Sequence, residues 1–142
     1  MKELKILIVA FVCLLAQSCT CNDGDIGPLW GTWRVTELEI NNEKVEDYSG
    51  TLYFCFQASV YVQRYVYEEI HGKDEVTAAW EYEGNDLLIY FSGVNGSHKP
   101  LAITGMQIGE NLVEVVKSSG DNMTLSYENP DGVVYTYYLK KW

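Results

Sequence analysis

Beyond residue 30 the chain alternates between short segments rich in β-branched and aromatic residues and short clusters of glycine, asparagine, aspartate and proline. Segments of this kind are typical of β-strands, and the clusters between them are typical of tight turns. No sustained apolar stripe at helical spacing is found in this region. We expect strands over 31–40, 51–57, 60–69, 75–83, 86–92, 112–118, 122–128 and 133–141. Their short connections predict consecutive hairpins and hence an antiparallel, up-and-down sheet.

The placement of apolar residues predicts that this sheet closes on itself. Near the C-terminus, Met123, Leu125 and Tyr127 alternate with polar residues, whereas segments 51–57 and 86–92 are apolar on both faces. An open sheet would expose one of those faces, and a barrel removes the free edges. We therefore expect an all-β fold, a single antiparallel barrel of about eight strands. An interior of that size is filled by side chains or holds one small ligand.

The sequence does not decide the structure of the longest connector, 93–111. Its middle part, 101–108, could form a further short strand, a helical turn or a lid across one mouth of the barrel. Loops of this length in compact domains are usually functional or contain an unrecognised element.

The first 18 residues are typical of a secretory signal peptide. Lys2 and Lys5 precede an unbroken apolar run of eleven residues at 6–16, and a membrane-spanning helix needs about 20. The segment that ends this run, Leu15-Ala16-Gln17-Ser18-Cys19, resembles the lipobox of bacterial lipoproteins. The resemblance implies cleavage before Cys19 and acylation of its thiol and new amino group, so that the lipid chains hold the protein on the membrane.

These features divide the chain into a signal peptide (1–18), a lipid-anchored tether (19–29) and a barrel (30–142). Thr20, and not aspartate, follows the acylated cysteine, so the inner-membrane retention signal of some bacterial lipoproteins is missing. We therefore expect a lipid-anchored protein of the cell envelope, placed in the outer membrane, on a side that the sequence leaves open.

Two cysteines remain once residues 1–18 are removed and Cys19 is acylated. The exported compartment permits a disulfide between Cys21 and Cys55. Because Cys21 lies in the tether and Cys55 in an expected strand, a buried free Cys55 is the favoured alternative.

The start of the first expected strand carries a family resemblance. Gly31-Thr32-Trp33 resembles the G-x-W signature of lipocalins. In that family the tryptophan plugs the closed end of the barrel, near a basic residue of the last strand. The resemblance implies that Lys140 or Lys141 lies against Trp33 as a cation–π partner, and we expect Gly31, Trp33 and Lys140 to form this barrel-closing motif. It also implies a lipocalin-like domain over the whole barrel, as in many small bacterial lipoproteins without an assigned function.

A barrel of this kind would draw its ligand-binding lining from aromatic strand residues, which combine apolar contact area with a hydroxyl. The same rings could simply form the core and outer surface. Arg64 shares a strand face with Val62 and Val66, where it could pair with an acidic group of an amphiphile or with a glutamate across the sheet; we favour the glutamate. The candidate ligand-binding residues are Tyr53, Arg64, Tyr65, Trp80, Tyr82 and Tyr127.

Composition and motifs reduce the number of functions that the chain could have. A net charge of -10 and a pI near 4.5 argue against nucleic-acid binding, which needs clustered basic residues. The sequence shows no catalytic motif, no metal-ligand spacing and no cofactor signature. We therefore expect a non-enzymatic lipoprotein that binds a small hydrophobic or amphipathic molecule. The alternative is an acidic protein-binding module, such as an inhibitor of a basic envelope-attacking enzyme.

Overall fold

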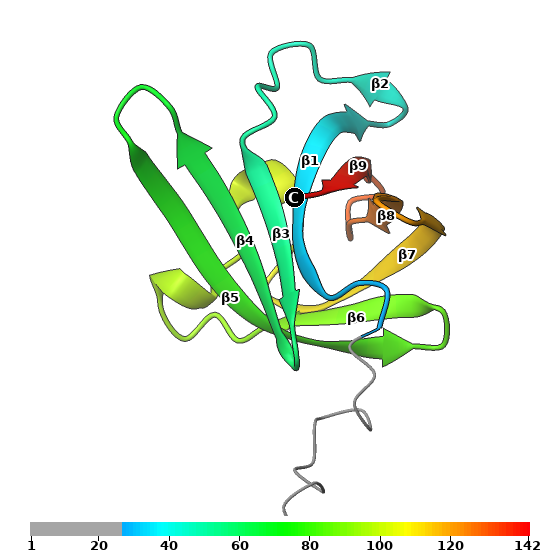
Figure 1. Cartoon of the computed structure of the whole chain (residues 1–142). Coiled ribbons are helices and arrows are strands. Elements are labelled where there is room, and N and C mark those ends of the chain that lie inside the picture. Colours follow the sequence, from blue (N-terminus) through cyan, green and yellow to red (C-terminus); the bar gives the residue numbers. More distant parts are fainter. Residues whose placement is uncertain (1–26) are drawn as a thin grey trace, which may run out of the picture.

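The computed structural model describes residues 27–142, which form a single antiparallel sheet closed into a barrel (Figure 1). The strands are β1 (Gly31–Ile40), β2 (Glu43–Lys44), β3 (Leu52–Gln57), β4 (Val60–Tyr67), β5 (Gly72–Glu83), β6 (Asp86–Phe91), β7 (Gly109–Ser119), β8 (Asn122–Glu128) and β9 (Val134–Lys141). From β3 onward each strand pairs with the next, and β1 pairs with both β3 and β9. Because β2 only pairs with the last two residues of β1, the barrel itself has eight strands, and the expected fold is confirmed.

The seam between β1 and β9 closes the barrel. Its register runs from Trp33 opposite Lys141 to Ile40 opposite Tyr135, with an irregularity between Val35 and Glu37. Bulges of this kind bend a strand and increase its twist. Closure leaves one inner and one outer face, so the parity of each residue along its strand decides which face it occupies.

Aromatic side chains fill the inner face. Six rings with no exposed surface lie there: Trp33, Phe54, Phe56, Tyr61, Phe91 and Tyr137. The five phenylalanine and tyrosine rings touch one another edge to face or at a tilt; the centroids of Phe54 and Tyr137 are 5.2 Å apart, and those of Phe56 and Tyr61 5.1 Å apart. Met123, Leu125 and Tyr127 of β8 are also buried, as their alternation predicts. The interior is therefore a packed core.

The C-terminal residue packs against Tyr53 on the outer face of β3. Trp142 packs edge to face on Tyr53 with 5.5 Å between ring centroids, and the Arg34 guanidinium lies 5.9 Å from the Trp142 ring. Beside them Cys55 is buried and its thiol is free, which confirms the favoured alternative for this residue. Cys19 and Cys21 lie outside the described residues.

The long connector between β6 and β7 forms two short 3-10 turns, η2 (Gly96–His98) and η3 (Ala102–Thr104). The first packs on the outer face of β5, where His98 Nδ1 lies 3.0 Å from Thr77 Oγ1. The second is the helical-turn alternative for residues 101–108. Within 27–142, no helix is long and apolar enough to cross a membrane.

The closed end of the barrel is organised around Trp33. Its indole Nε1 donates to Leu29 O at 2.9 Å, and Leu29, expected in the tether, is itself buried in the core. Lys141 Nζ lies 4.5 Å from the Trp33 ring centroid and donates to Trp30 O. The basic residue of the motif is therefore Lys141, and the expectation of Lys140 is wrong.

Lys141 and not Lys140 reaches Trp33 because alternate residues of a strand face opposite sides of the sheet. Tyr137 and Leu139 of β9 face inward, so Lys141 shares their side of the strand and stands opposite Trp33. Lys140 stands opposite Arg34 and is exposed.

We predict that Lys141→Met lowers the free energy of unfolding by about 1 kcal/mol, because it removes a cation–π contact together with a hydrogen bond to Trp30 O. Lys140→Met is the matched control and should change stability by less than about 0.5 kcal/mol, as exposed substitutions usually do. Urea unfolding followed by tryptophan fluorescence measures both. Equal effects of the two substitutions would contradict the assignment of Lys141.

Candidate functional site

Residues 101–106, which we call the plug, close the mouth of the barrel opposite Trp33. They comprise η3 and the residues that flank it, and within them Thr104 has no exposed surface and Met106 is 7% exposed. Tyr137 of β9 donates its hydroxyl to Thr104 O from inside the barrel. A segment outside the sheet thus contributes to the core.

Gln63 of β4 holds the plug from the other side of the barrel. This glutamine is fully buried, and its Oε1 accepts from Leu101 N at 2.8 Å. Its Nε2 lies 3.3 Å from Thr104 Oγ1, 3.2 Å from Met106 Sδ and 3.4 Å from Tyr61 Oη. A buried amide is costly unless it is hydrogen-bonded, so Gln63 and the plug stabilise each other.

Two buried phenols complete this polar group. Burial raises the pKa of Tyr61 and of Tyr137 well above the ordinary value near 10. Both hydroxyls therefore stay protonated at neutral pH, and Tyr137 remains a donor to Thr104 O.

Gly105 ends η3 and lies directly against the core. Its φ of +69° is in the left-handed region that favours glycine. A Cβ at this position would lie only 2.1 Å from Cε2 of Tyr135. The plug backbone therefore lies closer to this ring than a residue with a side chain would permit.

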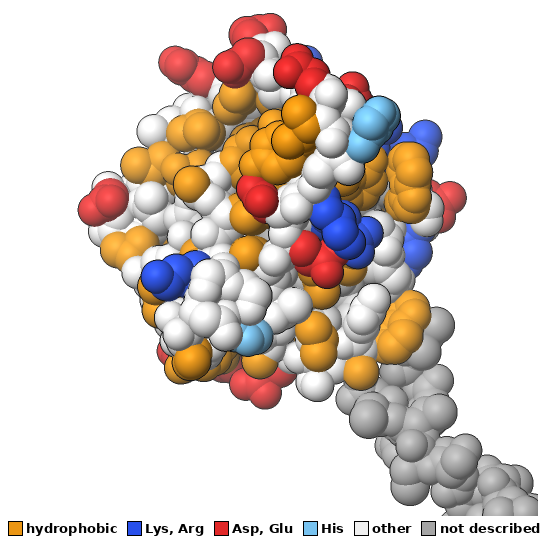
Figure 2. All heavy atoms as spheres, turned by 90° about the vertical axis from the view of Figure 1, so that its left-hand side faces the viewer, with side chains coloured by type: hydrophobic (Ala, Val, Ile, Leu, Met, Phe, Trp, Pro, Cys, Tyr) orange, Lys and Arg blue, Asp and Glu red, His pale blue; other side chains and the backbone are white. Residues whose placement is uncertain are grey.

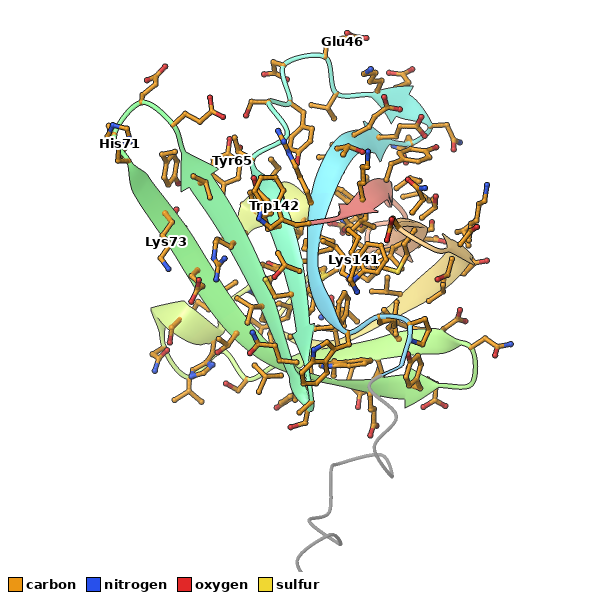
Figure 3. All side chains as sticks on the ribbon, viewed as in Figure 1. Glu46, Tyr65, His71, Lys73, Lys141 and Trp142 are labelled. Carbon is orange, nitrogen blue, oxygen red and sulfur yellow. The ribbon has the colours of Figure 1, made fainter. Side chains whose placement is uncertain are left out.

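An open cleft of about 390 Å³ lies between the plug and the β4–β5 hairpin. We call it the mouth cleft; it is lined by Tyr65, Tyr67, Asp74, Leu101, Ala102 and Ile103. Figure 3 labels Tyr65 on β4, below the hairpin tip that carries His71. Volume and lining are typical of a small-molecule site, where apolar walls surround a few polar groups.

A second pocket of about 310 Å³ adjoins the mouth cleft and shares Tyr65 and Tyr67 with it. Part of its wall comes from Ser49 and Thr51, in the loop that precedes β3. Tyr48 fixes this loop, because its hydroxyl donates to Val35 O at 2.5 Å and accepts from Leu52 N at 3.2 Å. Burial raises the pKa of Tyr48 to about 12, so this donor is also protonated at neutral pH.

The polar groups of the mouth cleft meet on the inward side of the hairpin. Tyr65 stands directly opposite Asp74 in the register of β4 and β5. The rings of Tyr65 and Tyr67 pack edge to face with 5.0 Å between centroids, and Tyr67 donates its hydroxyl to Asp74 Oδ2. This hydrogen bond raises the pKa of Tyr67.

Of the six residues expected to bind a ligand, two lie on the outer face of the barrel, which corrects their expected position. Tyr53 packs against Trp142. Arg64 Nε donates to Glu75 Oε2 at 2.7 Å across the sheet, which is the pairing we favoured from sequence. The ion pair raises the pKa of Arg64 and lowers that of Glu75.

The other four lie in three places. Trp80 and Tyr82 form an edge-to-face pair at the closed end, with 5.4 Å between centroids. Tyr127 is 3% exposed inside the core, and its buried hydroxyl has no hydrogen-bond partner. Tyr65 alone of the six lines the mouth cleft.

The sequence reasoning missed Gln63 and Asp74, whereas Tyr67 was among the aromatic strand residues considered for a pocket lining and the plug was one of the alternatives left open for residues 101–108. Gln63 did carry a signal, because it alternates with Tyr61 and Tyr65 and is a lone polar residue on an aromatic face. Asp74 belongs to a run of charged residues that is typical of a solvated turn. Only its pairing with Tyr65 in the structure shows that it lies at the mouth cleft. Among residues 27–142, no group of three or more His, Cys, Asp or Glu side chains is positioned to hold a metal ion.

Comparison with known proteins gives a consistent result. A family model described as a lipocalin-like domain matches residues 12–141. A lipocalin-like protein from Bacteroides uniformis has a similar structure, with a TM-score of 0.62 and 18% identity over 82% of this chain and 100% of that one. An uncharacterized protein from Bacteroides eggerthii is also similar, with a TM-score of 0.59 and 15% identity over 80% of this chain and 99% of that one. A search of curated proteins found no match.

Proposed function

Because the chain belongs to the family of lipocalin-like domains, we propose that it is an envelope lipoprotein that binds a small hydrophobic or amphipathic molecule without catalysis. The mouth cleft is the binding site in this proposal. The observation that carries it is the combination of a packed barrel interior with an open cleft of about 390 Å³ at the mouth. A ligand would be held between the plug and the hairpin, where aromatic and aliphatic walls face each other.

The chemistry of the cleft supports binding rather than catalysis. Its lining contributes two phenols and one carboxylate, and it includes no histidine, lysine or cysteine. His98 is turned to Thr77 on the outer face of β5, away from the cleft. Nucleophilic and acid–base mechanisms need a nucleophile and a base within hydrogen-bond reach of each other. Tyr67 and Asp74 are within such reach, but their hydrogen bond raises the pKa of the Tyr67 hydroxyl, which keeps this phenol in its weakly nucleophilic protonated form.

The anchoring half of the proposal rests on the sequence. The apolar run 6–16 and the lipobox-like segment ending at Cys19 support acylation of Cys19, and Thr20 supports placement in the outer membrane. Several acyl chains on one residue hold a protein on a bilayer far more firmly than a single chain.

The alternative of an acidic protein-binding module has less support. Net charge alone favours basic partners of any kind, whereas the mouth cleft has the dimensions and the apolar lining of a small-molecule site.

We predict saturable binding of a fluorescent fatty-alcohol probe to residues 22–142, which contain every strand, the seam and the plug. Ala102→Trp should weaken binding at least about tenfold, or by about 1.4 kcal/mol, because an indole on the exposed residue Ala102 fills the cleft. Ala79→Trp is the matched control: it also replaces an exposed alanine, but on the outer face of β5, and should change affinity less than about twofold.

Fluorescence titration and displacement by unlabelled alcohols measure these affinities. Absence of saturable binding would contradict ligand binding, and loss of binding in Ala79→Trp alone would move the site to the outer face.

For the anchor, we predict that cells fed an alkyne analogue of palmitate label the protein and that Cys19→Ala abolishes the label. Cys21→Ala, two residues away, is the control and should retain it. Label retained by Cys19→Ala, or absent from the unmodified protein, would contradict acylation at Cys19.

A further inference from the structure

The β4–β5 hairpin separates its charged side chains by face. Arg64 and Lys73 lie on the outer face, where both contact Glu75 Oε2, at 2.7 Å and 3.3 Å. Asp74 lies on the opposite side of β5, across from Tyr65, and lines the mouth cleft. Figure 2 shows this side of the barrel, with basic and acidic side chains in contact below a band of hydrophobic ones.

The carboxylate of Asp74 is therefore separated from the neighbouring cations. The ion pairs within residues 27–142 join Lys44 to Glu37 and both Arg64 and Lys73 to Glu75, and none of them includes Asp74. Its contact in the cleft is with the neutral hydroxyl of Tyr67, which orients the carboxylate and leaves its charge uncompensated.

The surroundings of the cleft have the same sign. Glu68 and Glu69 line the adjoining pocket that shares Tyr65 and Tyr67 with the cleft. Glu46 and Asp47 are exposed in the loop between β2 and β3, and Figure 3 shows Glu46 at the same end of the molecule as the tip of the hairpin. A concave site bordered by charges of one sign attracts ligands of the opposite sign and repels those of its own.

We propose, on the basis of the function proposed above, that the mouth cleft takes an amphipathic amine, with the ammonium group at Asp74 and the apolar part against the plug. Leu101 and Ile103 supply the aliphatic wall for that apolar part. The faces of Tyr65 and Tyr67 attract a cation through their ring quadrupoles, in addition to the charge of the carboxylate. A fatty-acid carboxylate in the same position would instead face Asp74 directly.

Three ligands with one eight-carbon chain and different head groups test this: octylamine, octan-1-ol and octanoate. Isothermal titration of residues 22–142 at low salt should show octylamine binding at least about tenfold more tightly than octan-1-ol, and octanoate more weakly than either. Raising the sodium chloride concentration to about 0.5 M should reduce the advantage of the amine, because partly exposed charges are screened.

Asp74→Asn removes the charge and keeps the shape of the side chain. It should reduce octylamine affinity about tenfold and leave octan-1-ol affinity within about twofold. Asp131→Asn, in the exposed turn between β8 and β9, changes the net charge equally and should leave both affinities within about twofold. Thermal unfolding by circular dichroism checks that each variant is folded.

The outcomes separate the two proposals. Binding of octan-1-ol or octanoate equal to or tighter than that of octylamine would overturn the amine assignment and leave hydrophobic-ligand binding intact. An amine preference that survives Asp74→Asn would overturn the role of Asp74. Failure of all three ligands and of the fatty-alcohol probe to bind would contradict the proposed function itself.

Discussion

The pairing of β1 with β9 is the constraint on which the rest of the structure depends. It joins the two ends of the described chain over the stretch from Trp33 to Ile40 and leaves eight strands arranged as a closed barrel. Closure assigns each strand residue to the inside or the outside. It also places Lys141, at the end of β9, against Trp33, near the start of β1, so that these two strands together close one end of the barrel.

The interior that closure creates is occupied by the protein itself. Aromatic rings fill the part near Trp33, and the plug fills the opposite mouth through Thr104 and the buried amide of Gln63. Apolar packing supplies the stability of such a core, while the Gln63 hydrogen bonds specify where the plug sits. The proposed ligand site therefore lies in the cleft at the rim and not in an internal cavity; the plug forms one wall of this cleft and the β4–β5 hairpin the other.

Much of this fold could be predicted from sequence, because strand alternation and turn composition are local signals. All eight expected barrel strands begin within about three residues of their observed positions; the largest differences are at β5, which starts at Gly72, and at β7, which starts at Gly109. The candidate ligand-binding residues were harder to place. Segments such as 51–57 are apolar on both faces, so their pattern does not say which face is inward, and Tyr53 was assigned to the wrong one. The plug has no periodic pattern, and Asp74 acquires its place only through pairing with β4.

The most direct test of the account is amide hydrogen exchange at the plug, followed by NMR. The amide of Leu101 lies outside every strand but donates to the buried Oε1 of Gln63, and that of Thr104 donates to Leu101 O. We predict that both are protected to a degree comparable with core strand amides such as Leu125, because exchange requires the plug to leave the barrel. Exchange at the rate of an open loop would contradict the self-filled barrel and return the ligand site to its interior.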